Sequence, residues 1–342
     1  MRRDIIGIDI AKHIFHIYIS DWKGKKILSK RIGRKQVLKF FKVQSEAIVG
    51  MEACGGANYW ARELLKLGHE VRLISPQKVK PYVGRQKNDE NDARAIAEAV
   101  RHPEMRFVPI KGIRHQDIQS IHRVRSRLVK QRTALSNEIR GLLLEYGVVI
   151  SKGHSHLVRQ SLECLERASE EVSEMMRGLL RELLEEFAEL AERIKVYDRR
   201  LEQVSRQEEV CERLKKVPGI GVITATALYA QLSDPRVYRN GREYAASLGL
   251  VPKQHSTGGK TKLLGISKQG DGYLRCLLVH GARSVVRTAK HREKPDRLRR
   301  WVSKKEALRG HNRACVALAN KTARIVWAMV AKGETYKALE AA

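Results

Sequence analysis

Four acidic residues in the first hundred positions have the types and surroundings that suit a metal site. Asp9 lies in the apolar string IIGIDI, where a buried carboxylate is costly unless a positive charge meets it. Glu52 follows the apolar run AIVGM, and Asp89 and Asp92 stand three residues apart in KNDENDARAIAEAV, on one side of a first helical turn. Because magnesium prefers oxygen ligands, these carboxylates predict a magnesium site.

Each of these residues also has an ordinary structural interpretation. Asp89 followed by Asp92 fits the capping box of a helix N-terminus, and by itself that interpretation is the stronger one. Glu52 would be an unremarkable charge at a strand end, and Asp9 would form a buried ion pair with Lys12. The metal-site hypothesis therefore depends on the four carboxylates meeting in space.

A second candidate for chemistry is Ser256, in the string SLGLVPKQHSTGGKTKLLGISKQGDGYLRCLL. Glycines and lysines around it predict a flexible, positively charged loop whose amides can approach a phosphate. The string GGKT resembles part of a nucleotide-binding phosphate loop, but Gln254 stands where that motif needs glycine. An ATP site is therefore not expected, and from its own surroundings Ser256 is an ordinary turn hydroxyl.

The carboxylates require a mixed α/β domain to position them. Short β-rich runs at 5–10, 15–20, 26–31, 47–51 and 71–75 alternate with helical stretches near 35–42, 57–67 and 90–101. Three hairpin-like strands followed by alternating helices and strands are typical of an RNase H or RuvC-like sheet, although an actin-like ATPase domain starts in the same way. We expect a catalytic domain over residues 1–110.

Helical periodicity replaces the strands over residues 111–210. A four-three spacing of apolar residues predicts a coiled-coil seam along one long helix, with the residues Met176, Leu180, Leu183, Phe187, Leu190, Ile194, Tyr197, Leu201 and Val204. An earlier helix is predicted at about 113–144, ending before Tyr146 and Gly147. The two helices would form either an antiparallel hairpin or an arm between subunits, and the pattern does not distinguish these.

The third section, 211–342, is predicted to be mainly helical and to contact nucleic acid. The chain has a formal net charge of +29, and between Lys253 and Arg313 there are 17 basic residues against 4 acidic ones. The string VPGIG resembles a helix-hairpin-helix turn, in which the amides of Gly219 and Gly221 would contact a phosphate backbone, although an ordinary Pro-Gly turn fits it equally well. Further candidate contacts with nucleic acid are Arg123, Arg125, Arg127, Lys130, Arg132, Lys253, Lys260, Lys262, Lys268 and Arg275.

Composition excludes several other classes. The five cysteines are isolated, with no C-x-x-C pair, which indicates ordinary thiols in a reducing cytosol. The N-terminal apolar run is too short for a signal peptide, and no stretch approaches the about 18 apolar residues of a membrane span. We therefore expect a cytoplasmic protein with no membrane partner.

The motifs together resemble one family. GIDIAK, then MEACGG, then KNDENDARAIA are similar to the DEDD insertion-sequence transposases, relatives of the Piv-type DNA invertases, and the resemblance covers nearly the whole chain. It implies a RuvC-like N-terminal domain in a prokaryotic, nucleoid-associated enzyme. Asp9, Glu52, Asp89 and Asp92 match the metal ligands of that family one by one. Two magnesium ions at such a site would support an in-line displacement at phosphorus.

The resemblance also changes the interpretation of Ser256. In that family a serine between a GL-x-P segment and a GISK-x-G-D segment is implied to attack DNA, and Ser256 matches this serine. His255 is a candidate for the base that takes the serine proton, but its position next to Ser256 in the sequence does not show how the two side chains lie. The resemblance further implies donor and target double-stranded DNA, a structured guide (bridge) RNA held near residues 123–132, and a homo-oligomer, dimer or tetramer. A rival hypothesis is a RuvC-like endonuclease that uses water, and a third is a non-catalytic nucleic-acid-binding scaffold.

Overall fold

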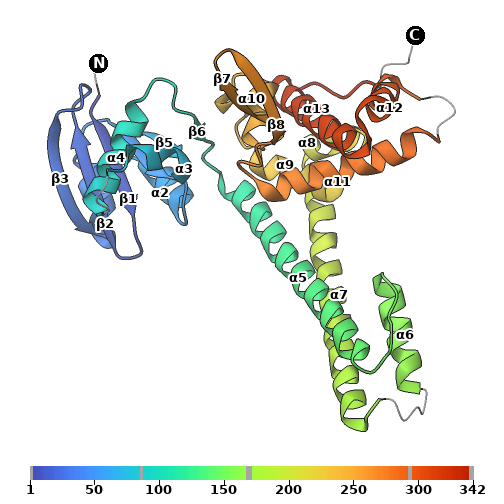
Figure 1. Ribbon diagram of the computed structural model, residues 1–342. Coiled ribbons are helices and arrows are strands. Elements are labelled where there is room, and N and C mark those ends of the chain that lie inside the picture. The colour runs from blue at the N-terminus through green and yellow to red at the C-terminus, as the bar shows by residue number, and fades with distance from the viewer. Residues whose placement is uncertain (1–2, 85–87, 167–171, 292–294, 339–342) are drawn as a thin grey trace. The chain divides into compact units, whose positions relative to one another are not determined.

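A computed structural model describes residues 3–84, 88–166, 172–291 and 295–338 (Figure 1). The chain divides into two compact units, each assembled from separate stretches. One contains Met1–His115, Ala230–Asp271 and Asn320–Glu334, and the other contains Gln116–Tyr229, Gly272–Ala319 and Thr335–Ala342.

A six-stranded mixed sheet forms the centre of the N-terminal region, in the order β3-β2-β1-β4-β5-β6. The parallel pairs are β1 with β4 and β4 with β5, and the remaining pairs are antiparallel. The strands are β1 Ile5–Ile10, β2 Ile14–Ser20, β3 Lys26–Gly33, β4 Ile48–Glu52, β5 Glu70–Ile74 and β6 Phe107–Val108. The five predicted strands are confirmed to within two residues, and the sheet is consistent with the predicted α/β class.

Helices cover both faces of this sheet. Ile6 and Ile8 belong to a core with α1 (Val37–Lys42) and α2 (Ala57–Lys66), whereas Ile5 packs on the other face with α4 (Asp89–Arg101). This alternation along β1 follows from the two-residue period of a strand. Short elements that the sequence did not predict complete the region: η1 Arg34–Gln36, α3 Pro76–Val79, η2 Lys80–Tyr82 and the two-residue strand β6.

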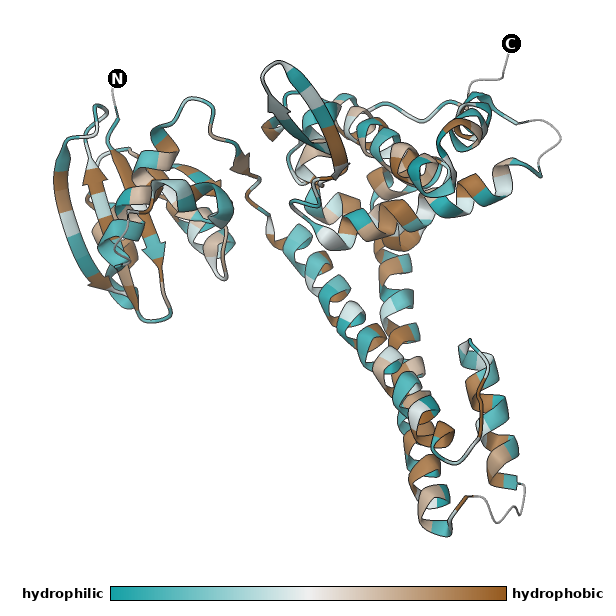
Figure 2. Ribbon diagram, viewed as in Figure 1, coloured by the Kyte–Doolittle hydropathy of each residue, from teal (hydrophilic) through white to brown (hydrophobic). Residues whose placement is uncertain are grey.

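Two long helices, α5 (Ile113–Leu144) and α7 (Glu174–Gln207), pack against each other within one chain. The predicted seam carries this contact, since Leu180 and Ile194 share a buried cluster with Leu128 and Ile139. The apolar residues of both helices line their facing sides (Figure 2). The antiparallel hairpin is therefore the arrangement within the chain. A further helix that was not predicted, α6 (His154–Glu166), adds to the same core.

The C-terminal section is mainly helical, as predicted, but the segment around Ser256 is not the flexible loop that we expected. It forms a two-stranded antiparallel hairpin of β7 (Pro252–Thr257) and β8 (Lys260–Ile266). The other elements are α8 Glu209–Lys215, α9 Val222–Gln231, η3 Pro235–Val237, α10 Gly241–Ser247, α11 Gly272–Ala289, α12 Arg297–Arg309 and α13 His311–Lys332.

Helix α13 bears on the expectation that no stretch of the chain spans a membrane. Of the helices in the described residues, it alone is long and apolar enough to pass as a membrane span by length and composition. This match is weak evidence for a membrane span, because core helices of soluble proteins pass the same test. Residues of α13 such as Leu318, Ala323 and Val326 are fully buried within the protein.

Candidate active-site residues

Asp9 and Glu52 lie at the same level of the sheet. Strands β1 and β4 are parallel neighbours, with Ile8 opposite Met51, and each acid follows directly after that pair. Both carboxylates therefore stand at the carboxyl ends of adjacent central strands, where α/β sheets place their functional groups. Both side chains are half-buried. The hypothesis that Glu52 faces Asp9 required the two strands to be neighbours, and β1 and β4 are paired.

Close packing of α4 on the sheet brings the other two acids to the same place. A Cβ atom on Gly7 would lie 2.0 Å from the carbonyl oxygen of Ala93, and a Cβ on Gly50 would lie 2.1 Å from Val100 Cγ2. Only glycine at these two strand positions lets the helix approach so closely. The first turn of α4 is thereby fixed beside the end of β1.

The structure removes the capping interpretation of Asp89 and Asp92. The N-cap of α4 is Asn88, whose side-chain oxygen accepts a hydrogen bond of 2.7 Å from the backbone amide of Asn91. The two aspartates lie inside the first turn and are not needed as caps. Likewise, no ion pair joins Asp9 to Lys12 among the described residues.

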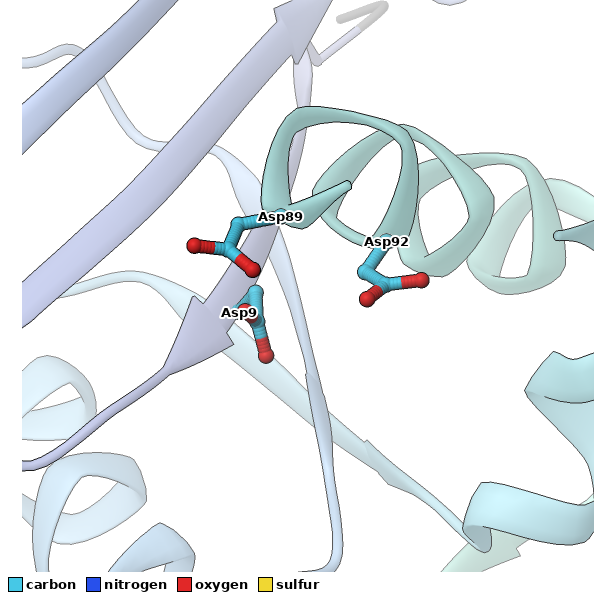
Figure 3. Close-up of side chains that lie close together, drawn as sticks. All are labelled: Asp9, Asp89 and Asp92. Atoms are coloured by element: carbon cyan, nitrogen blue, oxygen red, sulfur yellow. The ribbon is translucent and has the colours of Figure 1, made fainter. Parts of the chain in front are cut away.

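Carboxylate oxygens of Asp9, Asp89 and Asp92 all lie within 4.8 Å of one another (Figure 3). Burial, followed by the charges of Asp92 and Asp89, raises the pKa of Asp9 above its usual value. Burial and the charges of Asp9 and Asp92 likewise raise the pKa of Glu52. Hard oxygen donors that repel one another at this separation fit a divalent cation, which would offset both the repulsion and the desolvation.

His16 is a member of this site that the sequence did not reveal. It lies directly opposite Asp9 in the β1–β2 pair, and its Nε2 is 3.2 Å from a carboxylate oxygen of Asp89. Its charge, when protonated, lowers the pKa of Asp9 and so opposes the effect of burial. Only the strand register identifies this neighbour, because His16 is one residue within the alternating run IFHIYIS.

Ser256 is held near the tip of the β7–β8 hairpin. Gly258 and Gly259 form the two-residue turn with φ values of 53° and 76°. Two successive positive φ values are the requirement of a type I′ turn, which suits the twist of a hairpin. Ser256 is exposed and pairs with Thr261, and its Oγ accepts a hydrogen bond of 2.8 Å from Gln254.

The hairpin separates the serine from its basic neighbours. Lys262 pairs with His255, and Lys260 pairs with Thr257, so these residues lie on the face opposite to Ser256. His255 is therefore not placed to take the Ser256 proton in this conformation. Lys253 lies at the irregular step between Pro252 and Gln254.

Two further predicted phosphate contacts follow the hairpin. Lys268 is exposed and has a φ of 56°, the only positive value of a non-glycine residue in the described chain. Its backbone amide donates to Gly249 O at 3.2 Å, which holds the segment after β8 against the start of the hairpin. Arg275 lies in the first turns of α11 and is partly buried.

The predicted contacts on α5 divide into exposed and engaged residues. Arg123, Arg127 and Lys130 are exposed, whereas Arg125 forms an ion pair with Asp198 of α7. Arg132 is partly buried. The charge of Arg125 thus stabilises the helical hairpin, so its availability to nucleic acid is reduced.

The glycines of the VPGIG turn, between α8 and α9, have different surroundings. Gly219 has a φ of 86°, and its carbonyl oxygen lies 2.0 Å from where a Cβ of Gly281 would stand. This glycine pair is explained by the close approach of the turn to α11. Gly221 is exposed, with no atom within 4 Å of its Cβ position, so close packing does not explain this glycine.

Comparison with known proteins matches both halves of the chain to transposases. Residues 6–148 match a family described as transposase, of the DEDD type found in IS110, and residues 211–296 match the transposase IS116/IS110/IS902 family. The chain belongs to the IS110 family of transposases. Its enzymatic activity is therefore the recombination of DNA in transposition, and its substrates are DNA.

Curated relatives extend the match over almost the full transposase. A probable family 20 transposase of Pseudomonas aeruginosa is 47% identical over 334 residues, which is 97% of this chain and 98% of the relative. The transposase for insertion sequence element IS1111A of Coxiella burnetii is 44% identical, and the match covers 97% of this chain and 91% of the relative. The transposase for insertion sequence element IS1328 of Yersinia enterocolitica is 39% identical, with 97% and 98% covered.

Proposed function

We propose that this transposase exchanges DNA strands through a serine nucleophile assisted by magnesium. The observation that carries the proposal is the convergence of Asp9, Asp89 and Asp92 in one cluster, with Glu52 at the end of the neighbouring strand. These four residues would hold the metal, two ions by the family resemblance. Bound magnesium would supply the positive charge that activates an attacking oxygen and stabilises a departing one.

In this proposal Ser256 Oγ forms a bond to phosphorus while the phosphorus–oxygen bond of the DNA strand breaks. The hydroxyl proton of the serine passes to solvent water, and the oxygen of the departing strand end takes a proton from solvent. The hairpin keeps the serine exposed, which a covalent link to a polymer requires. The serine and the carboxylates would form one composite site, with the two contributed by different subunits of a dimer or tetramer assembled through the coiled-coil arm.

The proposal includes the predicted domain organisation: a RuvC-like catalytic domain at 1–110, a helical arm at 111–210 and a serine-containing DNA-binding domain at 211–342. A structured guide RNA, contacting exposed residues such as Arg123 and Lys130, would select donor and target DNA by base pairing. The setting would be the cytoplasm of a prokaryotic cell.

The test of the serine is a covalent adduct. The transposase is incubated with labelled DNA and magnesium, denatured, and assayed for DNA that remains attached to protein. The adduct should form in the natural chain and disappear in Ser256→Ala. Thr257→Ala is the matched control, because it removes the neighbouring hydroxyl from the opposite face of the same strand.

Two results would contradict this mechanism. Cleavage that continues at its normal rate in Ser256→Ala, with no adduct in either protein, would indicate hydrolysis by water. An adduct that survives Ser256→Ala but is lost in Thr257→Ala would identify Thr257, and not Ser256, as the nucleophile.

A further inference from the structure

The outer edge of the six-stranded sheet carries a concentration of positive charge that the proposed site does not use. Residues 21–43 contain nine basic residues and one acid, Asp21, about twice the density of basic residues in the whole chain, where 67 of 342 are Lys or Arg. All nine are exposed: Lys23, Lys25, Lys26, Lys30, Arg31, Arg34, Lys35, Lys39 and Lys42. We call this set the basic edge.

The charges of the basic edge are almost unpaired within the protein. In the described part of the chain, only Lys26 of the nine forms an ion pair, with Glu90 at 2.8 Å. Several of the cationic groups lie over aromatic rings: Lys30 Nζ is 5.9 Å from the centre of the Phe40 ring, and the Arg34 guanidinium is 5.1 Å from the centre of the Trp60 ring. These cation–π contacts do not neutralise the positive charges, as a carboxylate partner would.

Lysines on an edge strand have a known structural purpose, which is to prevent pairing with another sheet. That purpose needs only the residues of β3 itself. Here the charge continues past β3 into η1 and α1, through Arg34, Lys35, Lys39 and Lys42. Exposed basic residues on three successive elements at one edge of the sheet are better matched to a polyanion.

Strand register connects the basic edge to the carboxylate cluster. Asp9 lies opposite His16 in β1–β2, and His16 lies opposite Arg31 in β2–β3. Directly opposed residues project from the same face of a sheet, so Asp9, His16 and Arg31 form one row. With strands about 4.8 Å apart, the Cα atoms of Arg31 and Asp9 are about 10 Å from each other. Lys30, the neighbour of Arg31, projects from the opposite face.

We infer that the basic edge binds the phosphate backbone of the double-stranded DNA whose cleaved phosphate enters the carboxylate cluster, with Arg31 nearest to the reacting group. This inference rests on the proposed function only for the identity of that phosphate. The positive charge and the register that places Arg31 in one row with Asp9 favour DNA over an RNA partner, because the substrates of a transposase are DNA. The contacts would be independent of base sequence.

The first test measures binding without magnesium, so that it does not depend on Ser256 or on metal. Fluorescence anisotropy with a labelled DNA duplex is recorded over a range of salt concentrations for a triple variant, Lys30→Gln with Arg31→Gln and Lys35→Gln. The control triple, Lys152→Gln with Arg159→Gln and Lys195→Gln, removes the same charge from exposed positions elsewhere. Each lost phosphate contact should reduce the slope of log affinity against log salt by about 0.9.

The expected result is a slope reduced by about 2 to 3 in the edge triple and hardly changed in the control. An unchanged slope in the edge triple would overturn the inference. So would a loss of affinity confined to structured RNA, with duplex binding intact, since the surface would then belong to RNA. Failure of the serine mechanism would leave these binding results unaffected.

A second test separates Arg31 from its neighbour. At saturating DNA and with magnesium, Arg31→Gln should slow adduct formation by about tenfold or more, whereas Lys30→Gln should not. Equal rates in the two variants would contradict the placement of Arg31 beside the reacting phosphate. Circular dichroism of both variants checks that the exposed substitutions leave the fold intact.

Discussion

Replacing His122 should remove a specific part of the pH dependence of stability. His122 of α5 is buried, with 4% of its surface exposed, and both ring nitrogens are engaged within the same compact unit. Its Nε2 is 3.0 Å from Thr226 Oγ1, and its Nδ1 is 3.0 Å from Tyr273 Oη. Thr226 already donates its hydroxyl to Val222 O at 2.8 Å, so its oxygen accepts from Nε2–H. The Tyr273 hydroxyl then donates to Nδ1, and the ring is neutral.

The magnitude follows from the pKa of this ring. Burial, with a smaller contribution from the charge of Arg125, lowers the pKa of His122 from 6.5 to about 4. Because the folded pKa lies below the unfolded value, the unfolded chain binds the proton first as pH falls. Stability from the neutral ring is therefore complete above the unfolded pKa and is lost between about pH 6.5 and pH 4. At about pH 5 the loss is about 2 kcal/mol, since each tenfold change in proton affinity is worth about 1.4 kcal/mol.

The assay is urea unfolding followed by far-ultraviolet circular dichroism at about pH 7 and about pH 5. The stability difference between the natural chain and His122→Gln should shrink by about 2 kcal/mol on acidification, because glutamine does not titrate. His156→Gln, at an exposed position of α6, is the control and should follow the natural chain. A stability difference that is the same at both pH values would refute this account of His122.

Three further predictions follow from close contacts and charges. Gly7→Ala should lower the free energy of unfolding by about 1–3 kcal/mol and weaken magnesium binding, because the added Cβ would meet the Ala93 carbonyl oxygen. Gly55→Ala, where the added Cβ has open space, is the control, and thermal unfolding with and without magnesium measures both effects. Asp9→Asn should raise the melting temperature without metal, by relieving repulsion, and abolish the stabilisation by magnesium; a lower melting temperature would contradict the repulsion argument. Gly259→Val should disrupt the type I′ turn, at about 1–2 kcal/mol, and reduce adduct formation, and an undiminished adduct would show that the turn does not position the serine.

Much of the N-terminal domain could be predicted because its signals are local. Strands β1, β2 and β4 are rich in β-branched and apolar residues, and α4 follows a clear amphipathic pattern. The four carboxylates could be chosen because each follows or interrupts such a segment. Their convergence depended on the parallel pairing of β1 with β4 and on Gly7, which are long-range features that no local window contains.

The hairpin around Ser256 could not be predicted from hydrophobic patterning. Every residue of β7 is exposed, so the strand has no buried face and its sequence PKQHST has no apolar alternation. Two adjacent glycines, Gly258 and Gly259, fit both a flexible loop and a tight hairpin turn, so their presence does not distinguish these two structures. The position of His16 in the site could not be predicted for a related reason, because only the register between β1 and β2 makes it a neighbour of Asp9 and Asp89.

The lack of a buried face also affects the stability of this hairpin before DNA binds. Backbone hydrogen bonds and the two glycines hold the ribbon together, and every residue of its strands is exposed except Ile266 at the end of β8. An isolated two-stranded ribbon is marginally stable in water, so opening it requires little free energy. We expect its amides to exchange with solvent faster than those of β1 and to become protected when DNA binds. In the proposed mechanism, such coupling would keep the serine from attacking a strand until the DNA complex has formed.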